Sequence, residues 1–329
     1  MSTTPSTHAR LLDTAGRSVA AAVLLVCAVH AGTFQAGPMQ RGEDATLAEL
    51  WSPPPAGRDL FFGVGGRNLQ PDIRSVFTVM EIKARGFSDG YTVVDERHRE
   101  WSVKLPPEGS TEVVASRILW GIGYHQPPIY VLDRWKASGA TEPNPQRLAR
   151  FREKAPTFHG LKDQGVWSYY DNPFAGSRPM NGLLVFHAML GNSDLKDEQN
   201  AIYVLDEPVD GASRWFVARD LGQTFGRTGK MDPPRGDIDV FERTPFILGV
   251  TGGYVQFEYK GRHKQLFEHI TVDDVHWISA RLAGLTDRQW SDAFRAGGYP
   301  SAIASRFIHR LKTKIAEGLA LRPSKGRSS

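Results

Sequence analysis

Two short segments of the chain carry side chains whose types and spacing suit phosphoryl transfer. Asp194 is followed by Lys196 and then by the amides Gln199 and Asn200. This spacing can place a base, a cation and an amide oxygen in one loop. Asp220, the first residue of an Asp-Leu-Gly triplet, adds a second carboxylate after a predicted pair of strands. Transfer of a phosphoryl group from a nucleotide requires such a set of positioning, cationic and metal-binding groups.

Upstream residues complete the set. Lys104 lies in a predicted strand, from which a lysine can neutralise phosphate oxygens as a point charge. Glu112 follows in a predicted helix and can hold that lysine in place. The segment 86–90 can cover phosphates with backbone N–H groups and a hydroxyl, so we expect Ser88 and Gly90 to contact the nucleotide. Mg²⁺ is usually held by one carboxylate, one amide and substrate phosphates, which here predicts Asp220 with Gln199 or Asn200.

These residues resemble, in type and order, the signatures of the protein kinase-like superfamily. Val103-Lys104 looks like the strand lysine motif, the run 194–200 like the catalytic loop, and Asp220-Leu221-Gly222 like the metal-binding Asp-Phe-Gly. The prefix 191–194, Gly-Asn-x-Asp, is closer to the atypical branches: HipA-type, phosphoinositide-type, and secreted CotH-type and Fam-type kinases. The element order agrees over roughly residues 76–316.

The resemblance implies an ATP- and Mg²⁺-dependent phosphotransferase. Asp194 would orient or deprotonate the acceptor hydroxyl, and Asp220 would bind Mg²⁺. Lys104 would hold the phosphates with Glu112 as its partner, while Lys196 would stabilise charge near the γ-phosphate. The acceptor stays open between a protein hydroxyl, a lipid or sugar headgroup and a small molecule. No nucleic acid is expected as a partner, because a net charge of +4 is only mildly basic.

The chain departs from the family pattern at three points. The amide position five residues after the expected catalytic aspartate holds Gln199, with Asn200 one residue later. Lys104 and Glu112 are unusually close in sequence, and the segment 86–90 is no three-glycine loop. The main alternative is therefore a non-catalytic kinase-like module that binds nucleotide. A third hypothesis is a structural or interaction protein of the cell envelope.

Two rival motifs are weaker. The strand-like segment 59–66 runs into glycines, but a dinucleotide fingerprint would need a third glycine at Asn68 and a helix where Pro71 stands. The triplet Asp237-Ile238-Asp239 could be the metal-binding motif of a glycosyltransferase, but no nucleotide-binding half precedes it.

The elements that must position these residues follow from hydrophobic periodicity and turn signals. A helix after the third strand should begin at Ser110 or Thr111, with an apolar stripe at Val114, Ile118 and Ile122. A buried helix is expected at 182–190, and further helices follow a cap at Thr271. Strands are predicted at 76–82, 91–94, 101–105, 129–132, 201–205, 214–218 and 254–259.

We therefore expect an α+β, bilobal kinase-like fold, with an antiparallel-sheet N-lobe that holds one helix and a mainly helical C-lobe. The predicted divisions are a signal peptide or anchor at 1–31, a linker or arm at 32–58, a strand-rich nucleotide-binding lobe at 59–137, a mainly helical catalytic lobe at 138–321 and a disordered basic tail at 322–329.

The N-terminus carries the signals of export. Arg10 and Arg17 precede the apolar run 19–29, which is shorter than the roughly 20 residues of a membrane span, and Ala31 ends a cleavage-like triplet. We expect a periplasmic or extracellular protein, or one held at the membrane by an uncleaved N-terminus; a plain apolar N-terminal helix is the other possibility. Cys27 is the single cysteine, so no intrachain disulfide can form.

Overall fold

The computed structural model describes residues 45–83, 90–139 and 148–322. The chain divides into two units, 1–40 and 41–329, and every described residue belongs to the second. The predicted signal peptide, Ser88 and nearly all of the predicted basic tail lie outside the described residues. In the part that is described, no helix has the length and apolar character needed to cross a membrane.

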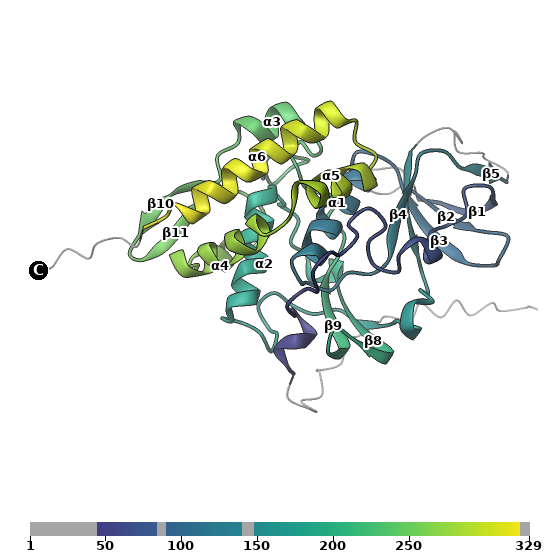
Figure 1. Cartoon of the computed structure of the whole chain (residues 1–329), viewed down its shortest axis with the longest axis horizontal. Helices are drawn as coiled ribbons and strands as arrows, with labels where there is room; N and C mark the ends of the chain where they lie inside the picture. The colour runs from purple at the N-terminus through teal and green to yellow at the C-terminus, as the bar shows by residue number, and fades with distance from the viewer. Residues whose placement is uncertain (1–44, 84–89, 140–147, 323–329) are drawn as a thin grey trace, which may run out of the picture. The chain divides into compact units, whose positions relative to one another are not determined.

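A six-stranded sheet forms the first part of the fold (Figure 1). Its strand order is β4-β6-β3-β2-β1-β5, and every neighbouring pair is antiparallel except β1 with β5. The predicted antiparallel meander is confirmed as the first three strands. The strands are β1 (Val76–Lys83), β2 (Gly90–Val94), β3 (Glu100–Lys104), β4 (Ile129–Leu132), β5 (Lys136–Ser138) and β6 (Ala149–Glu153).

The sequence did not predict β5 and β6. The sheet therefore continues past the expected lobe boundary at residue 138, because β6 lies between β3 and β4 and pairs with both. This strand is short, and the segment that precedes it in the sequence has the composition of a loop. Its place in the sheet depends on pairing with strands far away along the chain, which local patterns do not record.

One buried helix, α1 (Glu108–Gly121), packs against the sheet and against the C-terminal helix α5 (Asp287–Ala296). The predicted N-cap at Ser110 or Thr111 is wrong, because Pro107 occupies the N-cap position and the first helical residue is Glu108. The Thr111 hydroxyl instead donates to the Gly222 carbonyl at 2.6 Å. The predicted stripe is buried, but so is most of the helix, with twelve of its fourteen residues in the interior. Any charge on α1 must therefore find its partner inside the protein.

The rest of the described chain is mainly helical. The buried helix and the hairpin predicted from the sequence are confirmed as α2 and as β8 with β9, and Thr271 caps α4 as expected. Strands β7 and β10 and the short helix α3 were not predicted. The elements are β7 (Lys162–Gly165), α2 (Arg178–Leu190), β8 (Asn200–Val209), β9 (Ala212–Ala218), α3 (Ile238–Arg243), β10 (Ile247–Thr251), β11 (Tyr254–Phe257), α4 (Val272–Ala283), α5 (Asp287–Ala296) and α6 (Ser301–Leu319).

The fold is α+β, and an antiparallel-rich sheet with one helix is followed by a mainly helical part, in the order that the sequence predicts. Neither rival motif has the structure it would need. Residues 59–66 form turns that lead into a short 3₁₀ helix, with no strand and no α-helix. The Asp237 carboxylate caps α3 by accepting the Val240 N–H at 3.0 Å.

Two buried histidines make the stability of the fold depend on pH. Burial lowers the pKa of His125 to about 4 and that of His187 to about 3. An exposed histidine titrates near pH 6.5, so between pH 6.5 and 4 the unfolded chain binds more protons than the folded one. The contribution of both rings to stability is complete above pH 6.5 and is lost as the pH falls.

We predict that acidification from pH 6.5 to 4.5 lowers the free energy of unfolding less steeply in His125→Gln than in the wild type. One histidine contributes a slope of up to about 1.4 kcal/mol per pH unit in this range. Urea denaturation at several pH values measures that slope. Parallel curves for the two proteins would contradict a neutral buried His125.

Candidate active site

The residues predicted from three separate motifs meet at one cleft. A cavity of about 310 Å³ is lined by Lys104 at the end of β3, by Asp194, Lys196 and Gln199 in the loop after α2, and by Asp220 two residues after the end of β9. These positions are far apart in the sequence, and only the packing of the sheet, α1 and the β8–β9 hairpin brings them together. Gly90, the first residue of β2, also lines the cleft, whereas Ser88 lies outside the described residues.

Lys104 is the cation at the centre of this cleft. Only the three residues Leu105, Pro106 and Pro107 separate β3 from α1, which is the short turn that the sequence required. The Lys104 ammonium forms an ion pair with Asp220 and lies 3.4 Å from the Glu112 carboxylate. The structure thus contains the predicted pair between strand lysine and helix glutamate.

Glu112 also forms ion pairs with two arginines. Its carboxylate lies 3.0 Å from the Arg150 guanidinium and 3.2 Å from that of Arg152, and its side chain is 2% exposed. Lys104 and Arg150 stand directly opposite each other on β3 and β6, where two like charges repel. The Glu112 carboxylate contacts both cations and compensates this repulsion.

The pKa values of the cluster follow from this balance. Burial alone would raise the pKa of Glu112, but Arg150, Lys104 and Arg152 together bring it below its usual value. Burial would likewise lower the pKa of Lys104, yet Glu112 and Asp220 raise it overall. Both groups are therefore charged at neutral pH.

Packing of the two residues after Asp220 fixes the position of this aspartate. Its φ of +56° is in the left-handed region, which aspartate tolerates better than most residues. Leu221 is buried in the main core, and Gly222 lies so close to α1 that a Cβ there would be 2.9 Å from the Glu108 Cβ. Burial would raise the Asp220 pKa, but the Lys104 ammonium and then Arg152 lower it well below its usual range. The carboxylate is thus ionised, and in this structure its cation partner is the Lys104 ammonium.

Buried hydrogen bonds fix the loop that carries Asp194. The amide of Asn192, 2% exposed, donates to His187 Nδ1 at 3.1 Å and accepts the Asp194 backbone N–H at 3.1 Å. His187 belongs to the buried helix α2, so the core of the protein sets the backbone at Asp194. Because the Asn192 amide donates to Nδ1, the imidazole must be neutral at that nitrogen, in keeping with its low pKa.

The Asp194 carboxylate accepts hydrogen bonds from two side chains and forms an ion pair with a third. Lys196 Nζ and Gln199 Nε2 each lie 2.8 Å from its Oδ2, and Arg262 Nε lies 3.2 Å from its Oδ1. Lys196 and Gln199 come from the same loop, whereas Arg262 comes from the segment after β11. This arrangement orients the carboxylate toward the cleft and keeps a cation beside it.

Of the two amides that could bind a metal ion, Gln199 is the one at the cleft. Asn200 begins β8, is 1% exposed and donates to the Trp167 carbonyl at 3.1 Å in the interior. Gln199 is the last residue of the short 3₁₀ helix Asp197–Gln199 and lines the cleft, whereas the chain turns into β8 at Asn200 and buries that side chain.

Several residues of the cleft were missed by sequence reasoning. Arg235, on the segment before α3, forms an ion pair with Glu108 in the first turn of α1. Arg150 and Arg152 had a usable signal, because arginines two apart around Phe151 would share one face of a strand. The cationic side chains of the lining are Lys83, Lys104, Arg150, Arg152, Lys196 and Arg235, and its acidic ones are Glu108, Asp194 and Asp220.

This excess of positive charge suits an anionic ligand such as a polyphosphate. In the described part of the chain, no three His, Cys, Asp or Glu side chains gather into a metal site of their own. A Mg²⁺ ion usually takes only one or two protein carboxylates and completes its shell with phosphates and water. Asp220 with the Gln199 amide oxygen is a donor set of that kind.

No protein-family model and no curated protein sequence matches the chain. Among solved structures, it is similar to the proinflammatory kinase CtkA of Helicobacter pylori, with a TM-score of 0.33 and 13% sequence identity. The alignment covers 74% of this chain and 98% of the Helicobacter chain. A likeness this distant carries no weight for the activity, which we infer from the residues of the cleft themselves.

We predict that Glu112→Gln destabilises the fold by about 3–5 kcal/mol, because removal of one member of a buried charge cluster leaves the others uncompensated. Urea denaturation measures the change. Asp206→Asn is the matched control: Asp206 pairs with Lys162 at 2.8 Å, both side chains are 62% exposed, and the loss should stay below about 1 kcal/mol. Equal effects of the two substitutions would show that Glu112 is not the buried centre of the cluster.

Proposed function

We propose that the protein is an ATP- and Mg²⁺-dependent phosphotransferase of atypical kinase-like type. The observation that carries the proposal is the convergence of Lys104, Asp194 and Asp220 on one cation-rich cleft. Phosphoryl transfer is catalysed mainly by positioning and by charge stabilisation, and these three residues supply both.

Lys104 would bind phosphate oxygens of the nucleotide. In the structure it is paired with Asp220, so binding would exchange one set of ionic contacts for another: the lysine toward phosphate, the aspartate toward the metal ion. Glu112 would keep the lysine in place from behind, since it lies 3.4 Å away in the interior. Asp220 and Gln199 would hold Mg²⁺, which supplies neutralisation of phosphate charge when bound.

Asp194 would accept the proton of the acceptor hydroxyl or orient that hydroxyl. Lys196, 2.8 Å from the carboxylate, would remain close enough to stabilise negative charge on the transferred group. The hydrogen bonds from His187 through Asn192 limit the movement of the loop, which keeps the two side chains at a fixed separation.

The acceptor is a hydroxyl on a protein, a lipid or sugar headgroup, or a small molecule. We also propose that the protein is exported or anchored at the membrane, on the basis of the apolar run at 19–29.

One observation favours the alternative of a non-catalytic nucleotide-binding module. The Asp194 carboxylate is in contact with Lys196, Gln199 and Arg262. It would have to lose some of these contacts to act as a base.

We predict that the wild-type protein converts ATP to ADP in the presence of Mg²⁺ and that Asp194→Asn lowers this rate at least about 100-fold, the usual minimum for loss of a general base. Coupled ADP detection and mass spectrometry of added hydroxyl acceptors measure the transfer. Asp239→Asn is the control: this exposed carboxylate on α3 pairs with Arg306, away from the cleft.

Transfer by Asp194→Asn at the wild-type rate would contradict the assignment. Nucleotide binding without any ADP formation by the wild type would instead favour the non-catalytic module.

A further inference from the structure

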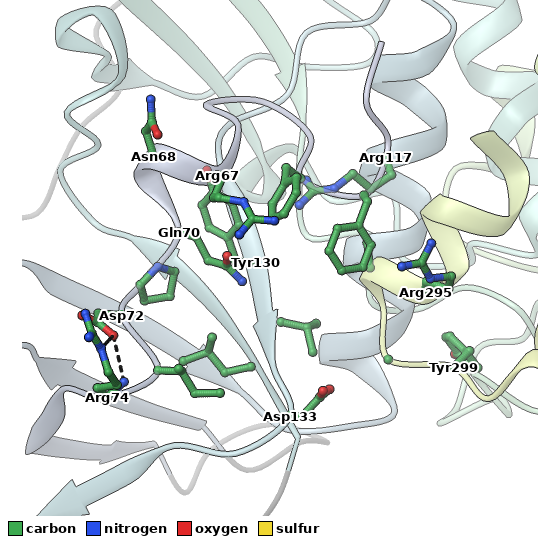
Figure 2. Close-up of a pocket in the computed structure, with 18 of the residues that line it drawn as sticks. Arg67, Asn68, Gln70, Asp72, Arg74, Arg117, Tyr130, Asp133, Arg295 and Tyr299 are labelled. Atoms are coloured by element: carbon green, nitrogen blue, oxygen red, sulfur yellow. Dashed lines mark hydrogen bonds and ion pairs between the residues drawn. The ribbon is translucent and has the colours of Figure 1, made fainter. Parts of the chain in front are cut away.

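A second and larger cavity lies apart from the cleft. Its volume is about 850 Å³, and it is enclosed by the segment 61–74, by β4 with Asp133, and by the chain from Arg295 to Pro300 at the end of α5 (Figure 2). None of its lining residues lines the cleft that holds Asp194 and Asp220. A volume of this size is in the range of small-molecule sites, roughly 300–1,000 Å³.

Arginine dominates the charge of this second cavity. Two of the arginines are neutralised, since Arg74 pairs with Asp72 at 2.9 Å and Arg295 with Asp292 at 2.7 Å. The other three have no carboxylate within ion-pair distance in the described part of the chain. They are Arg67, Arg97 and Arg117, and Figure 2 shows Arg67 and Arg117 pointing toward one another.

Arg117 is the residue that most needs an anion. Its side chain lies on α1 and is 1% exposed, and its Nη2 donates to the Ile129 carbonyl at 2.6 Å. Its Nε is buried without a hydrogen-bond partner, its guanidinium carbon lies 5.7 Å from the centre of the Tyr130 ring, and the Asp59 carboxylate acts on it only from beyond ion-pair distance. A buried charge that has no counter-ion is costly, and a bound anion would offset that cost.

The backbone is shaped around this guanidinium. Gly63 has a φ of +67°, and a Cβ at that position would lie 2.2 Å from Arg117 Nη1. Any other residue would collide with the charged group, so the turn at Gly63 fits closely over it. Burial lowers the pKa of Arg117 to about 10, which leaves it protonated at neutral pH.

Two other arginines of the cavity stack on aromatic rings. The Arg67 guanidinium lies 4.6 Å from the centre of the Phe62 ring, and that of Arg295 lies 4.8 Å from the centre of the Phe61 ring. Stacking of this kind fixes the plane of a guanidinium, so the Arg67 N–H edge can make a bidentate contact, whereas Arg295 already pairs with Asp292. The same rings offer an apolar surface to the organic part of a ligand.

We propose that this cavity, from here on the arginine pocket, binds a small phosphate monoester. Arg117 is the buried anchor for the phosphate, and the exposed Arg67 and Arg97 contact it from the mouth of the pocket. Phosphate fits better than a carboxylate because a dianion can neutralise several guanidinium groups at once and offers three oxygens to their N–H edges. The proposal stands independently of nucleotide binding at the cleft.

Arginine-specific labelling tests the site residue by residue. The full-length protein is treated with p-hydroxyphenylglyoxal, with and without phenyl phosphate, and the modified peptides are quantified by mass spectrometry. We expect phenyl phosphate to slow the labelling of Arg67 and Arg97 at least fivefold and to leave Arg288 unchanged. Arg288 is the control, because its side chain is 90% exposed and lies outside the pocket.

Two variants and a second anion complete the test. Arg117→Met should abolish the protection of Arg67 and Arg97. If it does not fold, the double variant Arg67→Gln/Arg97→Gln, altered only at exposed positions, should bind phenyl phosphate at least tenfold more weakly in calorimetry than Arg288→Gln. Benzoate at the same concentration should protect far less. Unchanged labelling with phenyl phosphate would overturn the proposed site, and equal protection by benzoate would overturn the phosphate assignment.

Discussion

The buried carboxylate of Glu112 is the group on which the sheet side of the cleft depends. It contacts Lys104, Arg150 and Arg152, three cations that two neighbouring strands place on one face. Without it, Lys104 and Arg150 would repel each other across β3 and β6. Because α1 is buried on most of its surface, the helix cannot turn Glu112 toward solvent, and the cations stay where a phosphate ligand would need them.

The opposite side of the cleft is held by a different interaction. There the loop after α2 takes its shape from neutral buried hydrogen bonds, from His187 to Asn192 and on to the Asp194 backbone. These bonds need an uncharged imidazole, whereas the Glu112 cluster needs full charges. Helix α1 also connects the cleft to the arginine pocket, because Glu112 and Arg117 lie on the same helix and face different sites.

Much of the cleft could be predicted from local sequence, because Lys104, Asp194 and Asp220 each belong to a short motif at an element boundary. The choice between Gln199 and Asn200 could not, since it depends on where β8 begins and which side of it faces the core. The start of α1 was also misplaced. Serine and threonine are preferred caps, but the short turn after β3 starts the helix before it reaches them. No local pattern in the sequence predicts the arginine pocket, because its arginines come from segments that meet only in the folded chain.

Joint binding of a metal ion and a nucleotide is the direct test of a nucleotide–metal site at the cleft. Electron paramagnetic resonance of Mn²⁺, titrated with protein and a non-hydrolysable ATP analogue, reports how much of the ion is bound. Protein and nucleotide together should bind more Mn²⁺ than the sum of what each binds alone, and Asp220→Asn should remove this excess. No excess with the wild-type protein, or an equal excess with Asp220→Asn, would contradict a nucleotide–metal site built on Lys104 and Asp220.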